Sequence, residues 1–147
     1  MRCRWHRGGS GRTYAMRKAS GRTVYLHRLI MNAEPGDMVD HVNGDPLDCR
    51  RSNLRIVTAS QNAANRAHTR ARSGFRNVEE RPSGRFRFRA AVVWQGQRYR
   101  TVYVETAEEA ARHADMMARL LYGSHASFNF PWPGERHCRP MRGQADG

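Results

Sequence analysis

The sequence predicts an α+β chain in two parts, a compact ββα unit and then a three-stranded antiparallel sheet packed on one helix. In residues 1–70, short apolar stretches separated by turn signals precede one capped helix. In residues 71–131, a segment of alternating apolar and polar residues and a glycine turn precede a long alanine-rich amphipathic segment. Residues 132–147 begin within a Pro-Trp-Pro-Gly break and are polar and rich in Gly and Arg, so we expect a disordered tail there.

Four short strands are expected in the first part, at residues 12–17, 22–26, 38–42 and 54–58. Ser20-Gly21 is a turn signal between the first two strands. Residues 26–33 are expected to form one or two helical turns. The segment 43–53 is polar and too long for a tight hairpin, so we expect an extended loop. Thr58 is the expected cap of the helix that follows, because Gln61 stands at the capping-box position.

In the second part, which follows a basic linker over residues 66–74, strands are expected at residues 75–80, 85–94 and 98–104. Alternation over 85–94 places Phe, Ala, Val and Trp on one face and three arginines on the other. Gln95-Gly96 is expected to make the hairpin turn. A helix is expected from its cap at Thr106, with Glu109 in the capping-box position, to Gly123.

The chain is strongly basic, with 26 Lys and Arg against 13 Asp and Glu and a formal net charge of +13. Every basic residue except Lys18 is arginine. This balance favours a polyanionic partner, and nucleic acid comes first, while a merely basic protein remains the alternative. The three cysteines are isolated, which argues against a zinc knuckle or a disulfide framework. No apolar run is long enough to span a membrane and the start lacks a signal-peptide core, so we expect a cytoplasmic protein with no membrane partner.

The adjacent pair Asp40-His41, followed by Asn53 and Asn62, can build a one-metal site that cleaves phosphodiesters. A neutral histidine can take a proton from water near pH 7. Asp and Asn oxygens favour Mg²⁺ or Mn²⁺. Because neighbouring side chains on a strand point to opposite faces, Asp40 can hold the metal while His41 faces the scissile phosphate.

Three segments in this region, LHRLI at 26–30, VDHVNGD at 39–45 and RRSNLR at 50–55, resemble the HNH endonucleases of phages and mobile introns. The resemblance covers roughly residues 22–66 and implies a ββα-metal fold. It further implies that Asp40 and Asn62 bind a divalent metal, Mg²⁺ or Mn²⁺, and that His41 is the general base. Asn53 would hold the loop and thereby orient the strand that carries His41. Asn62 stands at a motif position where other members carry His, a known variation in the group.

Three further segments, SGFRNV at 73–78, ETAEEAA at 105–111 and FNFP at 128–131, resemble the plant ethylene-response-factor (ERF, Apetala-type) DNA-binding domain. The resemblance covers about residues 73–131. It implies that the sheet enters the major groove and that its exposed side chains touch bases and phosphates. The candidate DNA-binding residues share the exposed faces of two expected strands: Arg85, Arg87, Arg89, Arg98 and Arg100. An ordinary solvated arginine face is the alternative.

Together these features predict a metal-dependent endonuclease that acts on double-stranded DNA, of a kind found in phages and their bacterial hosts. Its first module would hydrolyse phosphodiester bonds and its second would hold the DNA. Two other interpretations stay open. The chain can be a non-catalytic DNA-binding regulator whose nuclease domain has decayed, although the intact Asp40, His41, Asn53 and Asn62 argue against decay. It can also be a structural nucleic-acid chaperone, which only the charge supports.

Overall fold

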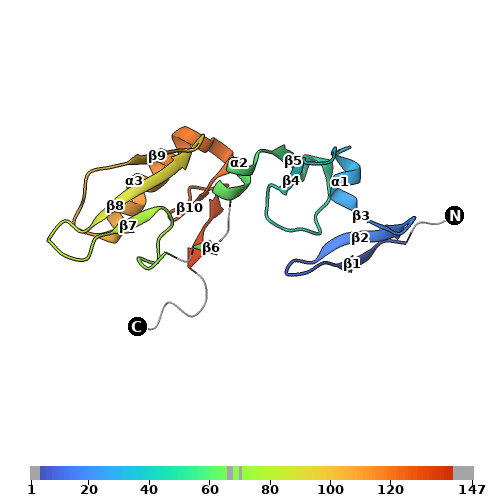
Figure 1. The fold of residues 1–147 in the computed structure, drawn as a ribbon, viewed down its shortest axis with the longest axis horizontal. Helices are drawn as coiled ribbons and strands as arrows, with labels where there is room; N and C mark the ends of the chain where they lie inside the picture. The colour runs from blue at the N-terminus through green and yellow to red at the C-terminus, as the bar shows by residue number, and fades with distance from the viewer. Residues whose placement is uncertain (1–3, 66–67, 70, 141–147) are drawn as a thin grey trace. The chain divides into compact units, whose positions relative to one another are not determined.

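The computed structural model describes residues 4–65, 68–69 and 71–140, and it divides the chain into two compact units, Met1–Ala59 and Ser60–Gly147. Figure 1 labels the helices and strands of both units. No helix in the described part of the chain has the length and apolar character needed to cross a membrane.

The first unit begins with an antiparallel sheet of β1 (His6–Gly8), β2 (Tyr14–Ala19) and β3 (Arg22–Tyr25), in that order. Ser20 and Gly21 both have positive φ, 48° and 74°, which suits a two-residue turn between twisted strands. The predicted hairpin is therefore confirmed. Strand β1 was not predicted, because a three-residue strand with two exposed side chains carries no apolar alternation.

A second hairpin in the first unit pairs β4 (Met38–His41) with β5 (Leu54–Val57), and its register places Asp40 opposite Arg55. The short helix α1 (Leu26–Ile30) precedes it, and a single 3₁₀ turn, η1 (Arg51–Asn53), leads into β5. Two short strands joined by a long polar loop are as predicted.

The short helix α2 (Ala59–Ala64) begins at the boundary between the two units. The hydroxyl oxygen of Ser60 lies 3.0 Å from that of Tyr122, and the Arg76 guanidinium donates to the carbonyl of Ala63. Because of these contacts, most of α2 falls in the second compact unit, while the expected domain boundary at residues 70/71 stays a prediction. The order strand, strand, helix is as predicted, whereas the packing of a ββα-metal unit stays a prediction.

The second unit contains an antiparallel sheet of β7 (Val78–Glu80), β8 (Phe88–Trp94) and β9 (Gln97–Arg100), with the helix α3 (Ala107–Tyr122) against it. The Thr106 hydroxyl accepts the Glu109 amide at 3.2 Å, so the predicted cap is confirmed. Gly123 ends the helix with φ of 54° and leads into the 3₁₀ turn η2 (Gly123–His125).

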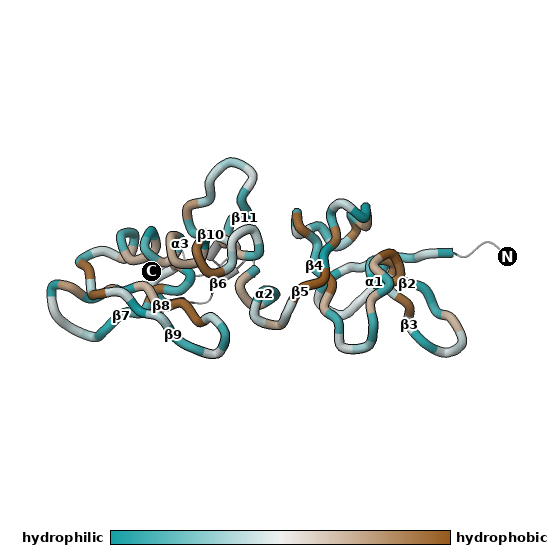
Figure 2. The backbone as a smooth tube through the Cα atoms, turned by 90° about the horizontal axis from the view of Figure 1, so that it is seen from above, coloured by the Kyte–Doolittle hydropathy of each residue, from teal (hydrophilic) through white to brown (hydrophobic). Residues whose placement is uncertain are grey.

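The core of this unit lies between α3 and the sheet, where alanines let helix and strands approach closely. Ala110 and Ala111 are fully buried and pack with Val78 and Val104, and three phenylalanines complete this cluster: Phe75, Phe88 and Phe130. Figure 2 shows hydrophobic stretches of the chain along β8 and β10. The sheet packed on one helix is thus present as predicted.

All three strands of this sheet end or begin short of their expected bounds, and β7 begins at Val78 instead of residue 75. Strand β8 begins at Phe88 instead of residue 85, because the Arg81 amide donates to the Arg87 carbonyl at 2.9 Å and closes a loop before it. Strand β9 ends at Arg100 instead of residue 104. The chain bulges after it and returns at Val104, whose amide bonds to the carbonyl of Phe88 at 2.6 Å.

The expectation of a disordered tail over residues 132–147 is wrong for residues 132–140. The short strand β10 (Ser127–Phe128) pairs in parallel with β11 (Arg136–His137), and β6 (His68–Thr69) pairs in parallel with β12 (Arg139–Pro140). Cys138 is only 3% exposed, and its amide donates to the Phe128 carbonyl at 2.7 Å. Residues 141–147, and residues 66, 67 and 70 of the expected linker, lie outside the described part of the chain.

A buried carboxylate, Asp115 on α3, connects the helix to the segment that follows it. Its two oxygens accept the Asn129 amide at 2.9 Å, the Asn129 side-chain nitrogen at 3.0 Å and the Phe130 amide at 2.7 Å. The side-chain oxygen of Asn129 in turn accepts the Arg76 backbone amide at 2.7 Å. Asp115 and Asn129 therefore tie α3 to the chain that enters β7.

We expect Asp115→Ala to destabilise the second unit by about 2–4 kcal/mol, because it leaves buried donors without an acceptor. Hydrogen exchange at the amides of α3 measures this change. Met116→Ala is the matched control, since Met116 is the next residue of the same helix and is 61% exposed. Equal protection of α3 in the two variants would contradict the role assigned to Asp115.

Candidate active site

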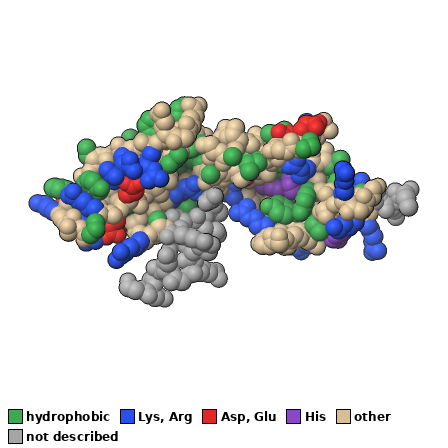
Figure 3. Space-filling model, viewed as in Figure 1, with side chains coloured by type: hydrophobic (Ala, Val, Ile, Leu, Met, Phe, Trp, Pro, Cys, Tyr) green, Lys and Arg blue, Asp and Glu red, His purple; other side chains and the backbone are tan. Residues whose placement is uncertain are grey.

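His41, the last residue of β4, is buried in a cluster of aromatic rings. Its ring centroid lies 5.1 Å from that of His27, at the start of α1, and 6.2 Å from that of Tyr14 on β2. Tyr25 contacts both Tyr14 and His27. In Figure 3 histidine side chains of the first unit lie beside hydrophobic ones. The cluster fixes the plane of the His41 ring from the side of the first sheet.

Burial lowers the pKa of His41 from its usual 6.5, an effect that the nearby Asp40 carboxylate opposes. Burial also lowers the pKa of His27, to about 4, with a smaller contribution from the charge of His41. Both rings are therefore neutral near pH 7, as a proton acceptor requires. Nε2 of His41 is buried and has no hydrogen-bond partner among the described residues. In this ring orientation Nδ1 is the nitrogen left to accept a proton from water.

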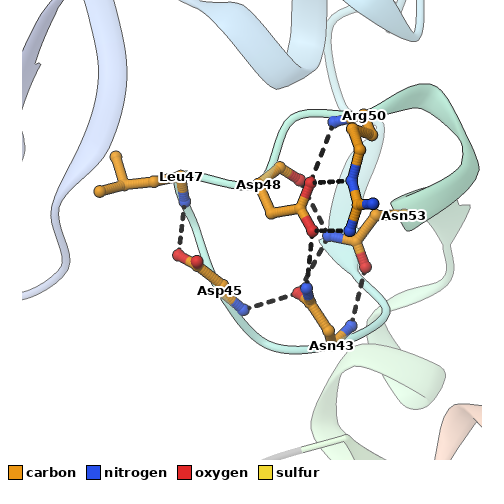
Figure 4. Close-up of polar contacts among 6 residues, drawn as sticks. All are labelled: Asn43, Asp45, Leu47, Asp48, Arg50 and Asn53. Atoms are coloured by element: carbon orange, nitrogen blue, oxygen red, sulfur yellow. Dashed lines mark hydrogen bonds and ion pairs between the residues drawn. The ribbon is translucent and has the colours of Figure 1, made fainter.

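The side chain of Asn53 closes the loop that follows His41 (Figure 4). Its carbonyl oxygen accepts the Asn43 amide at 3.0 Å, and its nitrogen donates to the Asn43 side-chain oxygen at 2.9 Å and to the Asp48 carbonyl at 2.8 Å. The Val42 amide donates to the Asn53 backbone carbonyl at 2.8 Å. These bonds connect the residues directly after His41 to the start of β5, as the role expected of Asn53 requires. Its part in catalysis stays a prediction.

Carboxylates complete the loop at its exposed side. Asp48 accepts the Arg50 guanidinium through both oxygens, at 2.8 and 2.6 Å, and Asp45 caps the Leu47 amide at 2.9 Å. The hydrogen bond from the Arg50 side chain is the main reason that the pKa of Asp48 is lowered to about 2. The loop is therefore ordered by its own side chains, as asparagine and aspartate turns are.

Asp40, the expected metal ligand, forms an ion pair that sequence reasoning missed. One oxygen of Asp40 accepts Nε and Nη2 of Arg55 at 3.1 and 2.9 Å, and both side chains are largely buried. Arg55 lies directly opposite Asp40 in the β4–β5 register, so this partner follows from the strand pairing once the register is known. Arg55 fixes the orientation of the Asp40 carboxylate on the hairpin.

Asn62, the other expected metal ligand, lies on α2 with its side chain exposed. Because α2 belongs mostly to the second unit, the pairing of Asn62 with Asp40 stays a prediction. In the described part of the chain, no group of three or more His, Cys, Asp and Glu residues is arranged to hold a metal ion. The expected pair contributes one carboxylate and one amide oxygen, which are donors of the chemical type that Mg²⁺ and Mn²⁺ accept.

The five arginines expected to bind DNA all form ion pairs in the second unit. Arg85 pairs with Glu105 and Arg87 with Glu80, while Arg89, Arg98 and Arg100 all pair with Glu79 on β7. Figure 3 shows basic side chains gathered around acidic ones over this unit. Arg85 and Arg87 precede β8, so their expected alternation along one strand is wrong. Nothing in the sequence predicted that Glu79 pairs with three arginines.

We expect the first unit to lose stability as the pH falls from about 6.5 to about 4. A base whose pKa is lower in the folded state binds fewer protons when folded, so unfolding takes up protons throughout this interval. The expected loss is about 1–3 kcal/mol, and urea denaturation followed by the NMR signals of residues 14–57 measures it.

His27→Phe is the matched control, because it keeps an aromatic ring in the cluster and removes the titrating group. This variant should lose a large part of the pH dependence. Asp48 contributes to the pH dependence of stability mainly at lower pH, because its pKa is lowered to about 2. If the stability of His27→Phe and that of the wild-type protein depend equally steeply on pH, His27 is not the titrating group responsible.

Comparison with known proteins gives one family match and two similar proteins. The model of the HNH endonuclease family matches residues 24–64. An uncharacterised HNH endonuclease of Acanthamoeba polyphaga mimivirus is 31% identical over 132 residues, which cover 86% of this chain and 66%, just under two thirds, of the viral protein. Ethylene-responsive transcription factor 3 of Nicotiana tabacum is 41% identical over 63 residues, which cover 43% of this chain and 28% of the tobacco protein.

No solved structure gives a significant match. The matched residues of the family model run from β3 to the end of α2 and include Asp40, His41, Asn53 and Asn62. Residues 24–64 of the chain are therefore similar to the HNH endonuclease family.

Proposed function

We propose that the protein is a metal-dependent endonuclease that hydrolyses phosphodiester bonds of double-stranded DNA, and that its second unit binds the duplex. The observation that carries the proposal is the β4–β5 hairpin, in which the Asn53 side chain closes the loop directly after the buried, neutral His41. The family match to the same residues supports it. The net charge of +13 agrees with a polyanionic substrate.

His41 is the general base of this proposal. Its lowered pKa keeps the ring neutral near pH 7, and Nδ1 takes the proton of the attacking water. The ring contacts with His27 and Tyr14 keep the imidazole in one plane, so little motion is needed when the proton moves. Asn53 contributes by holding the backbone after His41, without touching the substrate.

Asp40 and Asn62 are the proposed ligands of one Mg²⁺ or Mn²⁺ ion. The metal would supply positive charge for the phosphate and for the leaving oxygen. Arg55 holds the Asp40 carboxylate on the hairpin, which leaves that side chain little freedom to rotate. Both donor oxygens are hard ligands, and the exposed side chain of Asn62 is open to a metal and its waters.

The second unit is proposed to bind duplex DNA through the exposed arginines beside and on its sheet. The likeness to part of the tobacco factor supports this, because the matched protein is named as a transcription factor. Arg98 and Arg100 on β9 are 53% and 41% exposed in spite of their ion pairs. Guanidinium groups suit phosphate oxygens and guanine edges.

We expect His41→Ala to reduce plasmid nicking at least about 100-fold while leaving DNA affinity within a few-fold. The measurement is the rate of relaxation of supercoiled plasmid with Mg²⁺ or with Mn²⁺, and EDTA should abolish it for the wild-type protein. His6→Ala is the control, because His6 is an exposed histidine of the same unit. A His41→Ala protein that nicks at the wild-type rate would remove His41 as the base.

The same assay separates nuclease from regulator. A wild-type protein that binds DNA and cleaves with neither metal would support the non-catalytic regulator that the sequence left open. Weak DNA binding whose Kd does not change with salt concentration would argue against both the nuclease and the regulator.

We expect Arg98→Gln to lower the slope of log Kd against log salt by about one unit, because one phosphate contact is lost. Titration of a duplex with the protein in EDTA, at several salt concentrations, measures the slope. Arg112→Gln is the control, since Arg112 is an exposed residue of α3, the helix that covers the opposite face of the sheet. Equal slopes for the two variants would show that the Arg98 face does not contact phosphate.

A further inference from the structure

One carboxylate of the second unit, Glu79 on β7, contacts three guanidinium groups from the other two strands of its sheet, β8 and β9. Nε and Nη2 of Arg89 lie 3.0 and 2.8 Å from its Oε2, and Nε of Arg100 lies 3.2 Å from the same oxygen. Nη1 of Arg98 donates to Oε1 at 3.1 Å. The register explains this convergence, because Glu79 lies opposite Arg89 and the side chains of β9 with the same parity reach toward the same face.

Glu79 therefore accepts three hydrogen bonds, one from each arginine, and Nη2 of Arg89 adds an ion-pair contact. An ionised carboxylate offers about four lone-pair positions. The contacts of Arg89 and Arg100 fall on Oε2, and Oε1 accepts Arg98. Partial burial raises the pKa of Glu79, but the hydrogen bonds from Arg89 and Arg100 outweigh this and the pKa is lowered, so the group stays ionised. Glu79 is thus built to hold arginines.

The three arginines keep different groups for a ligand. Arg100 is held by Nε alone, so its terminal Nη1 and Nη2 have no partner among the described residues. These two nitrogens form the planar fork that matches O6 and N7 of guanine. Arg89 is fixed further, because its guanidinium lies 4.7 Å over the ring of Tyr103, which Arg81 also approaches at 4.5 Å.

Arg85 offers a contrast within the same unit. Its side chain is 73% exposed, and its one ion pair, to the half-exposed Glu105, is longer at 3.3 Å. An arginine held so loosely can follow a phosphate on any sequence. An arginine anchored at Nε presents its fork in one direction, so it gains most from an acceptor pair of the matching geometry.

We infer that Glu79 is a specificity-determining positioning residue, which anchors Arg100 and its neighbours so that the sheet recognises guanine edges in the major groove of duplex DNA. The inference rests on the proposed DNA-binding function of this unit. It assigns Glu79 two effects. It fixes the direction of the Arg100 fork, and its negative charge reduces the attraction of the face for phosphates in general.

Two pairs of variants test the inference in the full chain, with EDTA present to prevent cleavage. The probe is a library of randomised 20-base-pair duplexes, from which the wild-type protein selects its preferred sequences. The readout is the preference ratio, the Kd of an unselected duplex divided by that of a selected duplex. We expect guanine to be enriched in the selected duplexes.

Glu79→Gln should lower the preference ratio about tenfold, mainly because unselected DNA binds more tightly. Glu105→Gln is the control, because it removes the same charge from the same unit and releases only Arg85. It should tighten binding to all duplexes alike and leave the ratio within about twofold. Equal ratios for the two variants would overturn the inference.

Arg100→Lys should lower the preference ratio about tenfold with little change in the salt slope, because lysine keeps the charge and lacks the planar fork. Arg85→Lys, the matched control, should leave the ratio unchanged. This pair keeps the test decisive if Glu79→Gln fails to fold, which a thermal melt would show. An unchanged ratio in Arg100→Lys would overturn the inference.

The outcomes also separate the inference from the function on which it rests. A wild-type protein that binds duplexes without enriching guanine overturns the role of Glu79 and leaves DNA binding standing. A wild-type protein that binds no duplex overturns both.

Discussion

The hydrogen bonds of the Asn53 carboxamide are the constraint on which the candidate active site depends. One side chain satisfies the Asn43 amide, the Asn43 side chain and the Asp48 carbonyl, and its own backbone carbonyl accepts the Val42 amide. A polar loop of this length has no apolar core to order it, so its geometry comes from such bonds. Because the loop starts directly after His41, the residue that directly precedes β5 also restrains the backbone next to the imidazole.

Candidate functional side chains of both units are held by partners of opposite charge or by ring contacts. Arg55 holds Asp40, and Glu79 holds Arg89, Arg98 and Arg100. Long charged side chains lose considerable rotamer entropy when they bind a ligand. Ion pairs formed in the free protein remove part of that loss beforehand. The same pairs also lower the net charge that each face presents, which favours directional contacts over general attraction to phosphate.

Sequence reasoning succeeded where the signal is local. The hairpin at Ser20-Gly21, the capped helix from Thr106 and the strands on either side of the polar loop follow from turn residues, capping and alternation, and the structure confirms them. It failed where the cause is distant in the chain. The Cys138 amide donates to the Phe128 carbonyl, and this tertiary contact cannot be predicted from the polar composition of the segment around Cys138. The contacts of α2 with Tyr122 and Arg76 are likewise tertiary, and no local pattern predicts them.

The candidate site shows the same limit. Asp40, His41, Asn53 and Asn62 were predicted as a set because their spacing and residue types carry the chemistry. Arg55 and Glu79 were not, because an arginine after a motif and a glutamate within a short strand have many uses. Only the register, which places Arg55 opposite Asp40 and Glu79 opposite Arg89, gives them a role. Candidate catalytic residues can thus be proposed from type and spacing, whereas the residues that would position them become visible only when strands are paired.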